Sequence, residues 1–183
     1  MMSRRLAGAL GVLLAAAAGV GVWLLVRDSK PSTSATTTAA TTSVTPLGPV
    51  AATPASLLTY AKALGRPIYW AGPLPGYTYE FTETSSGNVF VRYLPKGVRI
   101  GDPRAAFRVI GTYPYVGALK ALQAVAKGTG ENLSGGGLLV RDSGHPKSVH
   151  IAYPGLDYEI EIYDPRPGRA RMLVLSGKVT PVQ

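Results

Sequence analysis

Residues 77–94 read YTYEFTETSSGNVFVRYL and contain two short segments in which apolar and polar side chains alternate. A period of two is typical of a β-strand that buries one face. Between the segments, Gly87 supplies the left-handed residue that a tight hairpin loop needs. The stretch therefore predicts a β-hairpin that closes with Thr84 paired to Asn88.

The register of this hairpin follows from its side chains. When Thr84 pairs with Asn88, Tyr79 faces Tyr93, and Glu80 faces Arg92 on the other side of the sheet. A cross-strand aromatic pair and a pair of opposite charges each stabilise a hairpin by about 0.2–1 kcal/mol. Both pairs favour the same alignment, which also places Phe81 opposite Val91.

Aromatic residues crowd the stretch that leads into the first strand. The PLPG turn is predicted to bring Trp70 to Tyr79 and Ile68 to Phe81, so that these side chains share one face. We interpret that face as hydrophobic core, because large aromatic rings are mostly buried; an exposed platform for a ligand is the alternative. Tyr69 falls on the opposite face and is predicted to be an exposed contact residue.

Two short helices and further strands are expected around the hairpin. Thr53 can cap a helix with Pro54 at its first position, and Gly65 ends that helix. A second amphipathic pattern spans 116–127. Further strands are expected over 105–113, 137–142, 148–153, 157–164 and 170–176. The prediction is an α+β domain of mainly antiparallel strands with two short helices, residues 54–183.

The first 28 residues are typical of a membrane anchor. Leu6 to Val26 is a run of 21 residues without a charge, which as a helix is about 31 Å long, the thickness of a bilayer core. A cleaved signal peptide is the alternative, although its apolar run is normally about 7–15 residues and ends at a small-x-small site. Arg4 and Arg5 precede the run, so the N-terminus is expected in the cytoplasm and the rest outside.

Residues 29–53 differ abruptly in composition from the segments on either side. Beyond Lys30 they carry no charge, and they are rich in Thr, Ser, Pro and Ala. Such a segment buries too little apolar surface to offset the entropy of ordering, so we expect a disordered linker. The sequence thus predicts a signal-anchor at 1–28, this linker, and an extracytoplasmic domain held at the cell membrane by a single pass.

Composition excludes several chemistries. The chain has no Cys and two His residues, His145 and His150, without an H-E-x-x-H motif. Thiol catalysis, thiolate metal sites and zincin-type hydrolysis are therefore excluded. No Walker A motif is present, and we expect no cofactor and no metal. Nucleic acid is not an expected partner of a domain outside the membrane.

The domain is basic. From Leu57 onward it holds 15 Lys and Arg against nine Asp and Glu, since four of the 19 basic and one of the 10 acidic residues come earlier. Outside a membrane, a basic patch can attract an anionic envelope polymer, lipid head groups or an acidic protein; an ordinary solvated surface is the alternative. The basic residues that cluster around Asp102 are Arg92, Lys96, Arg99, Arg104 and Arg108.

Two smaller groups of residues are candidates for chemistry. His150 is predicted to lie opposite Glu159, in a pair that could form a hydrogen bond or contribute to a metal site. Asp142, Ser143 and His145 place an acid, a hydroxyl and an imidazole in one turn. A plain turn is the alternative, because Asp and Ser favour turns and the groups of a catalytic triad normally converge from different elements.

A short pattern also recurs along the chain. The motif P-G-x-x-Y-E followed by an apolar residue occurs at 75–81 and again at 154–160, and Arg92 then corresponds to Arg171. Internal duplication is one interpretation. The other is that a Pro-Gly turn before an amphipathic strand simply occurs twice.

The layout as a whole resembles the membrane-anchored exported proteins of unknown activity that are frequent in actinobacteria. The features that carry the resemblance are the Arg-Arg-led anchor, the Thr-rich linker, and the segments YWAGPLPGYTYE and HIAYPGLDYEIEIYDP. The resemblance implies a place at the cell envelope but no catalytic residues. We therefore expect an envelope-anchored binding or interaction module. The alternatives are a hydrolase that uses Asp142, Ser143 and His145 or His150, and a passive subunit of a membrane complex.

Overall fold

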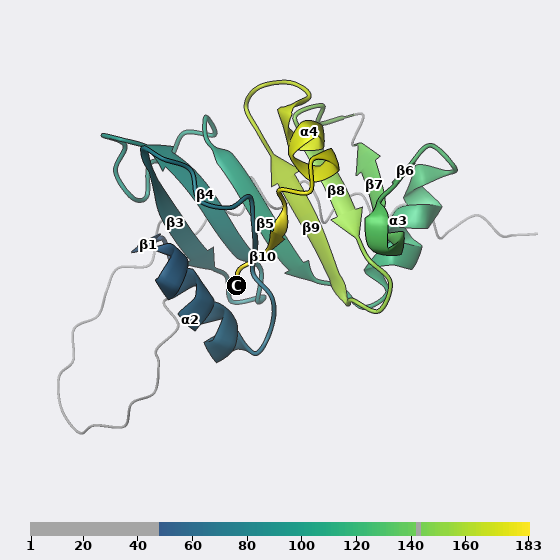
Figure 1. Ribbon diagram of the computed structural model, residues 1–183, viewed down its shortest axis with the longest axis horizontal. Helices are drawn as coiled ribbons and strands as arrows, with labels where there is room; N and C mark the ends of the chain where they lie inside the picture. The colour runs from purple at the N-terminus through teal and green to yellow at the C-terminus, as the bar shows by residue number, and fades with distance from the viewer. Residues whose placement is uncertain (1–47, 142–143) are drawn as a thin grey trace, which may run out of the picture.

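The computed structural model of this chain describes residues 48–141 and 144–183 (Figure 1). The expected anchor, most of the expected linker, and Asp142 and Ser143 lie outside these residues. The described part of the chain forms mostly antiparallel strands with three short α-helices. The predicted α+β class is therefore confirmed for the domain, with three helices in place of the expected two.

An eight-stranded antiparallel sheet forms the body of the domain. Its strands lie in the order β1-β3-β4-β5-β9-β8-β7-β6. The pairing of β5 with β9 joins the strands that come before α3 in the sequence to those that come after it. A second sheet pairs β2 with β10. The strand bounds are β1 Val50–Ala52, β2 Tyr69–Trp70, β3 Tyr77–Glu83, β4 Val89–Pro95, β5 Arg108–Pro114, β6 Glu131–Asn132, β7 Leu138–Arg141, β8 Ser148–Ala152, β9 Tyr158–Tyr163 and β10 Thr180–Pro181.

The predicted β3–β4 hairpin is confirmed in its register. Tyr79 is paired with Tyr93 and Glu80 with Arg92. The Thr84 amide donates to the Asn88 carbonyl oxygen over 2.9 Å. Gly87 occupies the left-handed region at φ 80°, as the loop requires. Local pattern and turn chemistry thus determine this part of the sheet.

Two of the three helices were predicted. In α2, Pro54–Leu64, the Ser56 amide donates to Thr53 Oγ1 over 3.1 Å and the Thr53 amide donates back to Ser56 Oγ over 2.8 Å. This reciprocal cap satisfies two amides that the helix itself leaves unpaired. The second predicted helix is α3, Ala118–Ala126. A three-residue 3-10 turn, Ser134–Gly136, precedes β7.

The strand expected over 170–176 is wrong, because this segment forms the third helix, α4, Arg169–Leu175. Its buried residues are Ala170, Leu173 and Val174, whereas Met172 is 58 % exposed. A strand would place positions 170, 172 and 174 on one face, but positions 170, 173 and 174 share a face at helical spacing. The short run of apolar residues was compatible with both patterns.

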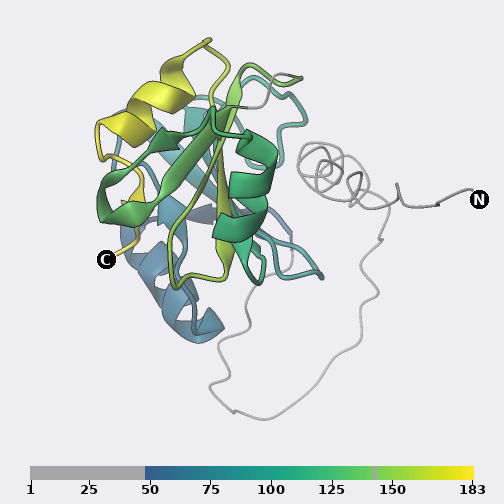
Figure 2. The ribbon, with the colours of Figure 1, turned by 90° about the vertical axis from the view of Figure 1, so that its right-hand side faces the viewer.

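The helices lie on opposite faces of the main sheet (Figure 2). On one face, the Tyr60 ring of α2 stacks on Phe81 of β3 with centroids 4.7 Å apart, and α4 and β2–β10 share the same core. On the other face, α3 packs through Ala118, Leu122 and Ala126 against β7 and β8. The larger core therefore lies between the sheet and the layer that contains α2, α4 and β10.

The segment before β3 is placed differently from the prediction. Trp70 does contact Tyr79, with the rings edge-to-face at 5.8 Å, and the predicted core face is confirmed by the burial of Trp70, Tyr79 and Phe81. However, β2 pairs with β10, and the strand beside β3 is β1. Because β2 crosses over the core, both of its faces are covered. Tyr69 is only 5 % exposed, so its predicted exposure is wrong.

The described domain begins before its first helix. Val50 is paired with Phe81 and Ala52 with Tyr79, which makes β1 an edge strand of the main sheet. These residues fall within the segment 29–53 that composition assigned to the linker. Ala52 is buried, so the last residues of that segment belong to the folded domain.

The two copies of the P-G-x-x-Y-E pattern do not have equivalent surroundings. The first leads into β3, which is followed by another strand, whereas the second leads into β9, which is followed by α4. Arg92 therefore lies in a strand and Arg171 in a helix. The structural correspondence between Arg92 and Arg171 is therefore absent.

Candidate functional site

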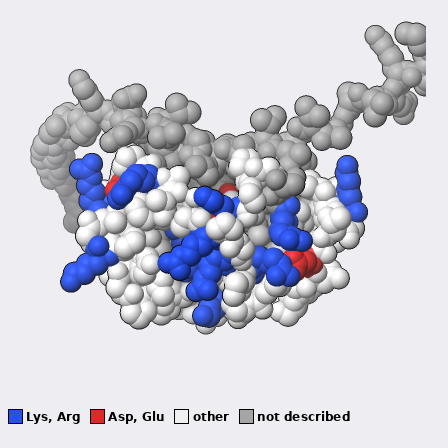
Figure 3. All heavy atoms as spheres, turned by 90° about the horizontal axis from the view of Figure 1, so that it is seen from above, with Lys and Arg blue, Asp and Glu red and all other residues white. Residues whose placement is uncertain are grey.

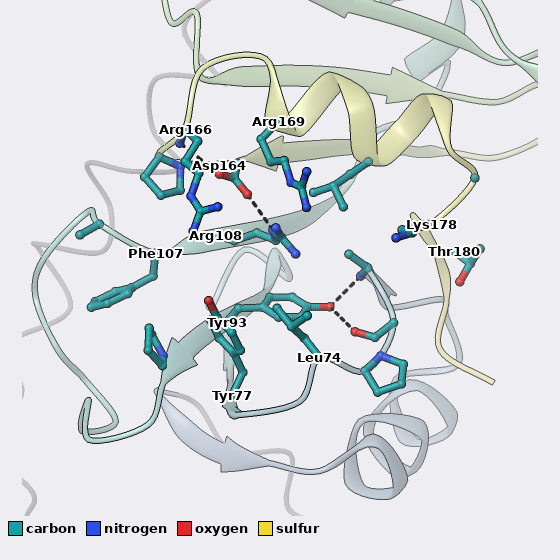
Figure 4. Close-up of a pocket in the computed structure, with 18 residues that line it drawn as sticks. Leu74, Tyr77, Tyr93, Phe107, Arg108, Asp164, Arg166, Arg169, Lys178 and Thr180 are labelled. Atoms are coloured by element: carbon teal, nitrogen blue, oxygen red, sulfur yellow. Dashed lines mark hydrogen bonds and ion pairs between the residues drawn. The ribbon is translucent and has the colours of Figure 1, made fainter.

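A cleft of about 720 Å³ opens between the loop that precedes β3 and the C-terminal segment around α4 (Figure 4). One wall comes from residues 71–77, and the facing wall comes from residues 164–180. Between the two walls, β4 and β5 contribute Tyr93 and Arg108. The cleft therefore depends on segments that are far apart in the sequence.

Four cationic side chains line this cleft, and they point toward its interior in Figure 4: Arg108, Arg166, Arg169 and Lys178. Asp164 is the one acidic residue among the described residues of the lining. Arg108 Nε donates to Asp164 Oδ2 over 2.9 Å, and both side chains are largely buried. The Arg108 guanidinium also lies 5.4 Å from the centroid of the Tyr93 ring, a cation–π contact. Arg108 is thus charge-balanced and held in place.

The positive charges of the other three cations are not balanced in this way by a carboxylate of the described residues. Arg166, Arg169 and Lys178 are exposed, and none of them forms an ion pair with a carboxylate in the part of the chain that the structure describes. Lys and Arg side chains also gather on the face seen from the α4 side of the molecule (Figure 3). The cleft consequently carries about three uncompensated positive charges.

Turns at both ends of α4 position these cations. The Arg166 amide donates to Asp164 Oδ1 over 3.0 Å, and the Arg169 amide donates to the Arg166 carbonyl oxygen over 3.2 Å. At the other end, Gly177 adopts φ 67°, which reverses the chain so that the Lys178 amide donates to the Leu173 carbonyl oxygen. Each cation therefore projects from a hydrogen-bonded backbone.

The facing wall is mainly apolar and is tied to the sheet by two tyrosines. Tyr93 Oη accepts from the Ala71 amide over 2.7 Å and donates to the Gly72 carbonyl oxygen over 3.0 Å. Tyr79 Oη accepts from the Leu74 amide over 2.7 Å. Burial raises the pKa of Tyr93, so its hydroxyl stays protonated and keeps both bonds. This wall is therefore formed before any ligand arrives.

The predicted basic patch around Asp102 does not assemble as one surface. Arg92 is buried: its guanidinium pairs with Glu80 at 2.6 Å and donates to the carbonyl oxygens of Asp102 and Arg104. Arg104 is exposed but paired with Asp102, and hydrogen bonds from Arg104 lower the pKa of Asp102 to about 2. Lys96 and Arg99 are exposed and lie outside the cleft lining. Arg108 is the one member of the patch that reaches the cleft.

Tyr69 is placed in the core, where its amide donates to Thr112 Oγ1 of β5 over 3.2 Å. Burial raises the pKa of its hydroxyl. Alternation placed Tyr69 on the face of β2 away from Trp70, but that face is also covered. Tyr69 is therefore a structural residue and has no surface to offer a ligand.

His150 and Glu159 do contact each other, with Nδ1 2.7 Å from Oε1. The register differs from the predicted one, because Glu161 is the residue directly opposite His150 and Glu159 lies diagonally. Glu161 accepts from Ser148 Oγ and Tyr113 Oη. Within the described ranges, no three His, Asp or Glu side chains are grouped so as to hold a metal ion. The His150–Glu159 pair lies beside this hydrogen-bond network on the α3 side of the sheet.

The remaining candidate group cannot be assembled from the described residues. His145 is exposed in the β7–β8 connection, while Asp142 and Ser143 lie outside the described residues. Sequence reasoning also missed three cations of the cleft, Arg166, Arg169 and Lys178. The segment DPRPGRAR, 164–171, could have pointed to Arg166 and Arg169, because its arginines fall within one turn and the start of a helix.

Comparisons with known proteins do not assign a function to this chain. The chain matches no protein-family model, no curated protein and no solved structure. None of the helices formed by residues 48–141 and 144–183 is both long enough and apolar enough to cross a bilayer. The function is therefore inferred from the chemistry of the cleft.

Proposed function

We propose that this protein is a binding module that holds an anionic ligand in the cleft beside α4. The observation that carries the proposal is the set of three cations, Arg166, Arg169 and Lys178, which share one cleft and pair with no carboxylate of residues 48–141 and 144–183. Positive charges that line a concave surface raise the local concentration of an anion and orient it. A wall held by Tyr79 and Tyr93 reduces the conformational entropy lost on binding.

The ligand is proposed to be a component of the cell envelope. This part of the proposal rests on the apolar run from Leu6 to Val26 and the polar segment that follows it, which favour a single-pass anchor with the domain outside. An anionic envelope polymer or an acidic protein then lies within reach of the cleft. Binding through Lys96 and Arg99 outside the cleft stays a prediction, as do hydrolysis and a passive role in a membrane complex.

Elution from phosphocellulose, a phosphorylated polysaccharide, tests the cleft directly with the full-length chain in detergent solution. We expect the double variant R166Q/R169Q to elute at clearly lower salt than the wild-type chain. The matched control is K62Q/K120Q, which also removes two positive charges, but from exposed positions on α2 and α3. Equal elution of the two double variants would show that net charge alone determines retention, and would contradict the proposal.

Fractionation of cells tests the location. The full-length chain is expected in the membrane fraction, and protease added from outside should release the domain by cleavage between Ser29 and Ser56. A mature chain that begins near residues 20–35 and is found in the medium would instead establish a cleaved signal peptide.

A further inference from the structure

The two walls of the cleft differ in chemistry. This difference restricts the class of ligand further than the requirement for a negative charge does. The wall from 164–180 presents cations, whereas the facing wall presents Leu74, Tyr77 and, from the end of β4, Pro95 (Figure 4). The volume of about 720 Å³ far exceeds what a small inorganic ion needs, and is in the range typical of sites for organic ligands. A ligand that fills the cleft therefore has an anionic group and a larger body.

The arrangement of the cations favours phosphate over carboxylate. A carboxylate has two oxygens in one plane, and a single guanidinium fork satisfies both. Arg166, Arg169 and Lys178 come from three separate backbone positions along the same wall of the cleft (Figure 4). A phosphate monoester carries a charge of about −1.5 to −2 at pH 7 and has three acceptor oxygens arranged in three dimensions. It therefore neutralises more of the positive charge of Arg166, Arg169 and Lys178 than a carboxylate, which carries a single negative charge.

The remaining polar groups of the cleft suit a body with hydroxyl groups. The Tyr77 hydroxyl points into the cleft in Figure 4, and neither it nor Thr180 Oγ1 forms a hydrogen bond within residues 48–141 and 144–183. The Tyr77 ring and Leu74 provide an apolar surface on the same wall as the Tyr77 hydroxyl. A sugar ring presents hydroxyl groups at its edge and C–H groups on its faces, so it matches both features.

We propose that the cleft binds the phosphate monoester of a sugar, with the phosphate against Arg166, Arg169 and Lys178 and the sugar against Tyr77. This inference rests on the proposed function, since it names the ligand class of the same cleft. It assigns Tyr77 to recognition of the sugar and the three cations to recognition of the phosphate. The phosphate source is either a free sugar phosphate or the phosphorylated end of an envelope glycan.

Calorimetric titration of the full-length chain with four probes tests the inference: glucose 6-phosphate, inorganic phosphate, glucuronate and glucose. We expect glucose 6-phosphate to bind roughly tenfold or more tightly than either inorganic phosphate or glucuronate, and glucose to bind more weakly still. Glucuronate binding as tightly as glucose 6-phosphate would overturn the preference for phosphate. Inorganic phosphate binding as tightly would overturn the role of the sugar.

Variants separate the two halves of the cleft. Tyr77→Ala is expected to weaken glucose 6-phosphate binding while leaving inorganic phosphate binding unchanged, and Arg166→Gln should weaken both. Tyr77→Phe keeps the ring and reports on the hydroxyl alone. An unchanged affinity of Tyr77→Ala for glucose 6-phosphate would refute the sugar contact. If none of the four probes binds but R166Q/R169Q still lowers retention on phosphocellulose, the sugar phosphate is wrong and anion binding stands.

Discussion

Glu80 and Arg92 face each other across the β3–β4 hairpin, with Glu80 Oε1 2.6 Å from Arg92 Nη1. The Glu80 side chain is fully buried and the Arg92 side chain is 6 % exposed. Glu80 Oε2 accepts from the Gly101 amide, and Arg92 Nη2 donates to the Asp102 carbonyl oxygen over 2.9 Å. The pair therefore ties the loop between β4 and β5 to the hairpin.

Removing one member of this pair should be strongly destabilising. Glu80→Gln removes the carboxylate that pairs with the buried Arg92 guanidinium, and we expect a loss of about 3–5 kcal/mol in the free energy of unfolding. Arg104→Gln is the comparison, because the Arg104 side chain is 63 % exposed and its pair with Asp102 should contribute far less. Urea unfolding of both variants measures the difference. Equal losses in the free energy of unfolding would show that the buried Glu80–Arg92 pair contributes no more to stability than the Arg104–Asp102 pair.

The aromatic core predicts a graded series of melting temperatures. Phe81 is fully buried under Tyr60, so Phe81→Ala should cost about 3–5 kcal/mol. Because Tyr69 is also buried, Tyr69→Ala should cost a similar amount, whereas Tyr77→Ala, at the margin of the cleft, should cost much less. A Phe81→Ala variant that melts close to the wild-type temperature would favour the platform of exposed rings over the core.

The fold was predictable where neighbouring residues decide it. The β3–β4 register follows from Gly87 and from two side-chain pairs that lie within a few residues of the loop. The pairings of β2 with β10 and of β3 with β1 were not predictable in this way, since β10 comes from the C-terminal end and β1 from a segment that resembles a linker. Such pairings depend on which layer covers the core, and alternation along one strand carries no information about that.

The candidate site was less predictable than the fold. Charge clustering in the sequence pointed to Arg92 and Arg104, but the structure pairs both with carboxylates. Arg166, Arg169 and Lys178 instead lie at the two ends of α4, the helix that replaces the strand predicted over 170–176. A binding cleft depends on which charges remain without a partner after folding, and that is a property of tertiary contacts.

The helical state of α4 can be tested with two neighbouring residues. Leu173 is 5 % exposed and Met172 is 58 % exposed. We expect Leu173→Ala to cost about 2–5 kcal/mol and Met172→Ala to stay within about 0.5 kcal/mol of the wild type. In a strand, position 172 would share the buried face of Ala170 and Val174, so a larger loss for Met172→Ala in urea unfolding would contradict the helix.

Acid is expected to remove a stabilising charge on Asp102. Hydrogen bonds from Arg104 lower the pKa of Asp102 from 3.8 to about 2, so the folded chain favours the ionised carboxylate more than the unfolded chain does. Its stabilising contribution is therefore present above about pH 4 and is lost as the pH falls toward 2. Asp102→Asn lacks this titration and still keeps an oxygen that can accept from the Arg104 amide. We expect the melting temperature of the wild type to exceed that of Asp102→Asn at pH 5 and to approach it as the pH is lowered to 2. A difference that stays constant across this range would show that Arg104 does not stabilise the charge of Asp102 in the folded protein.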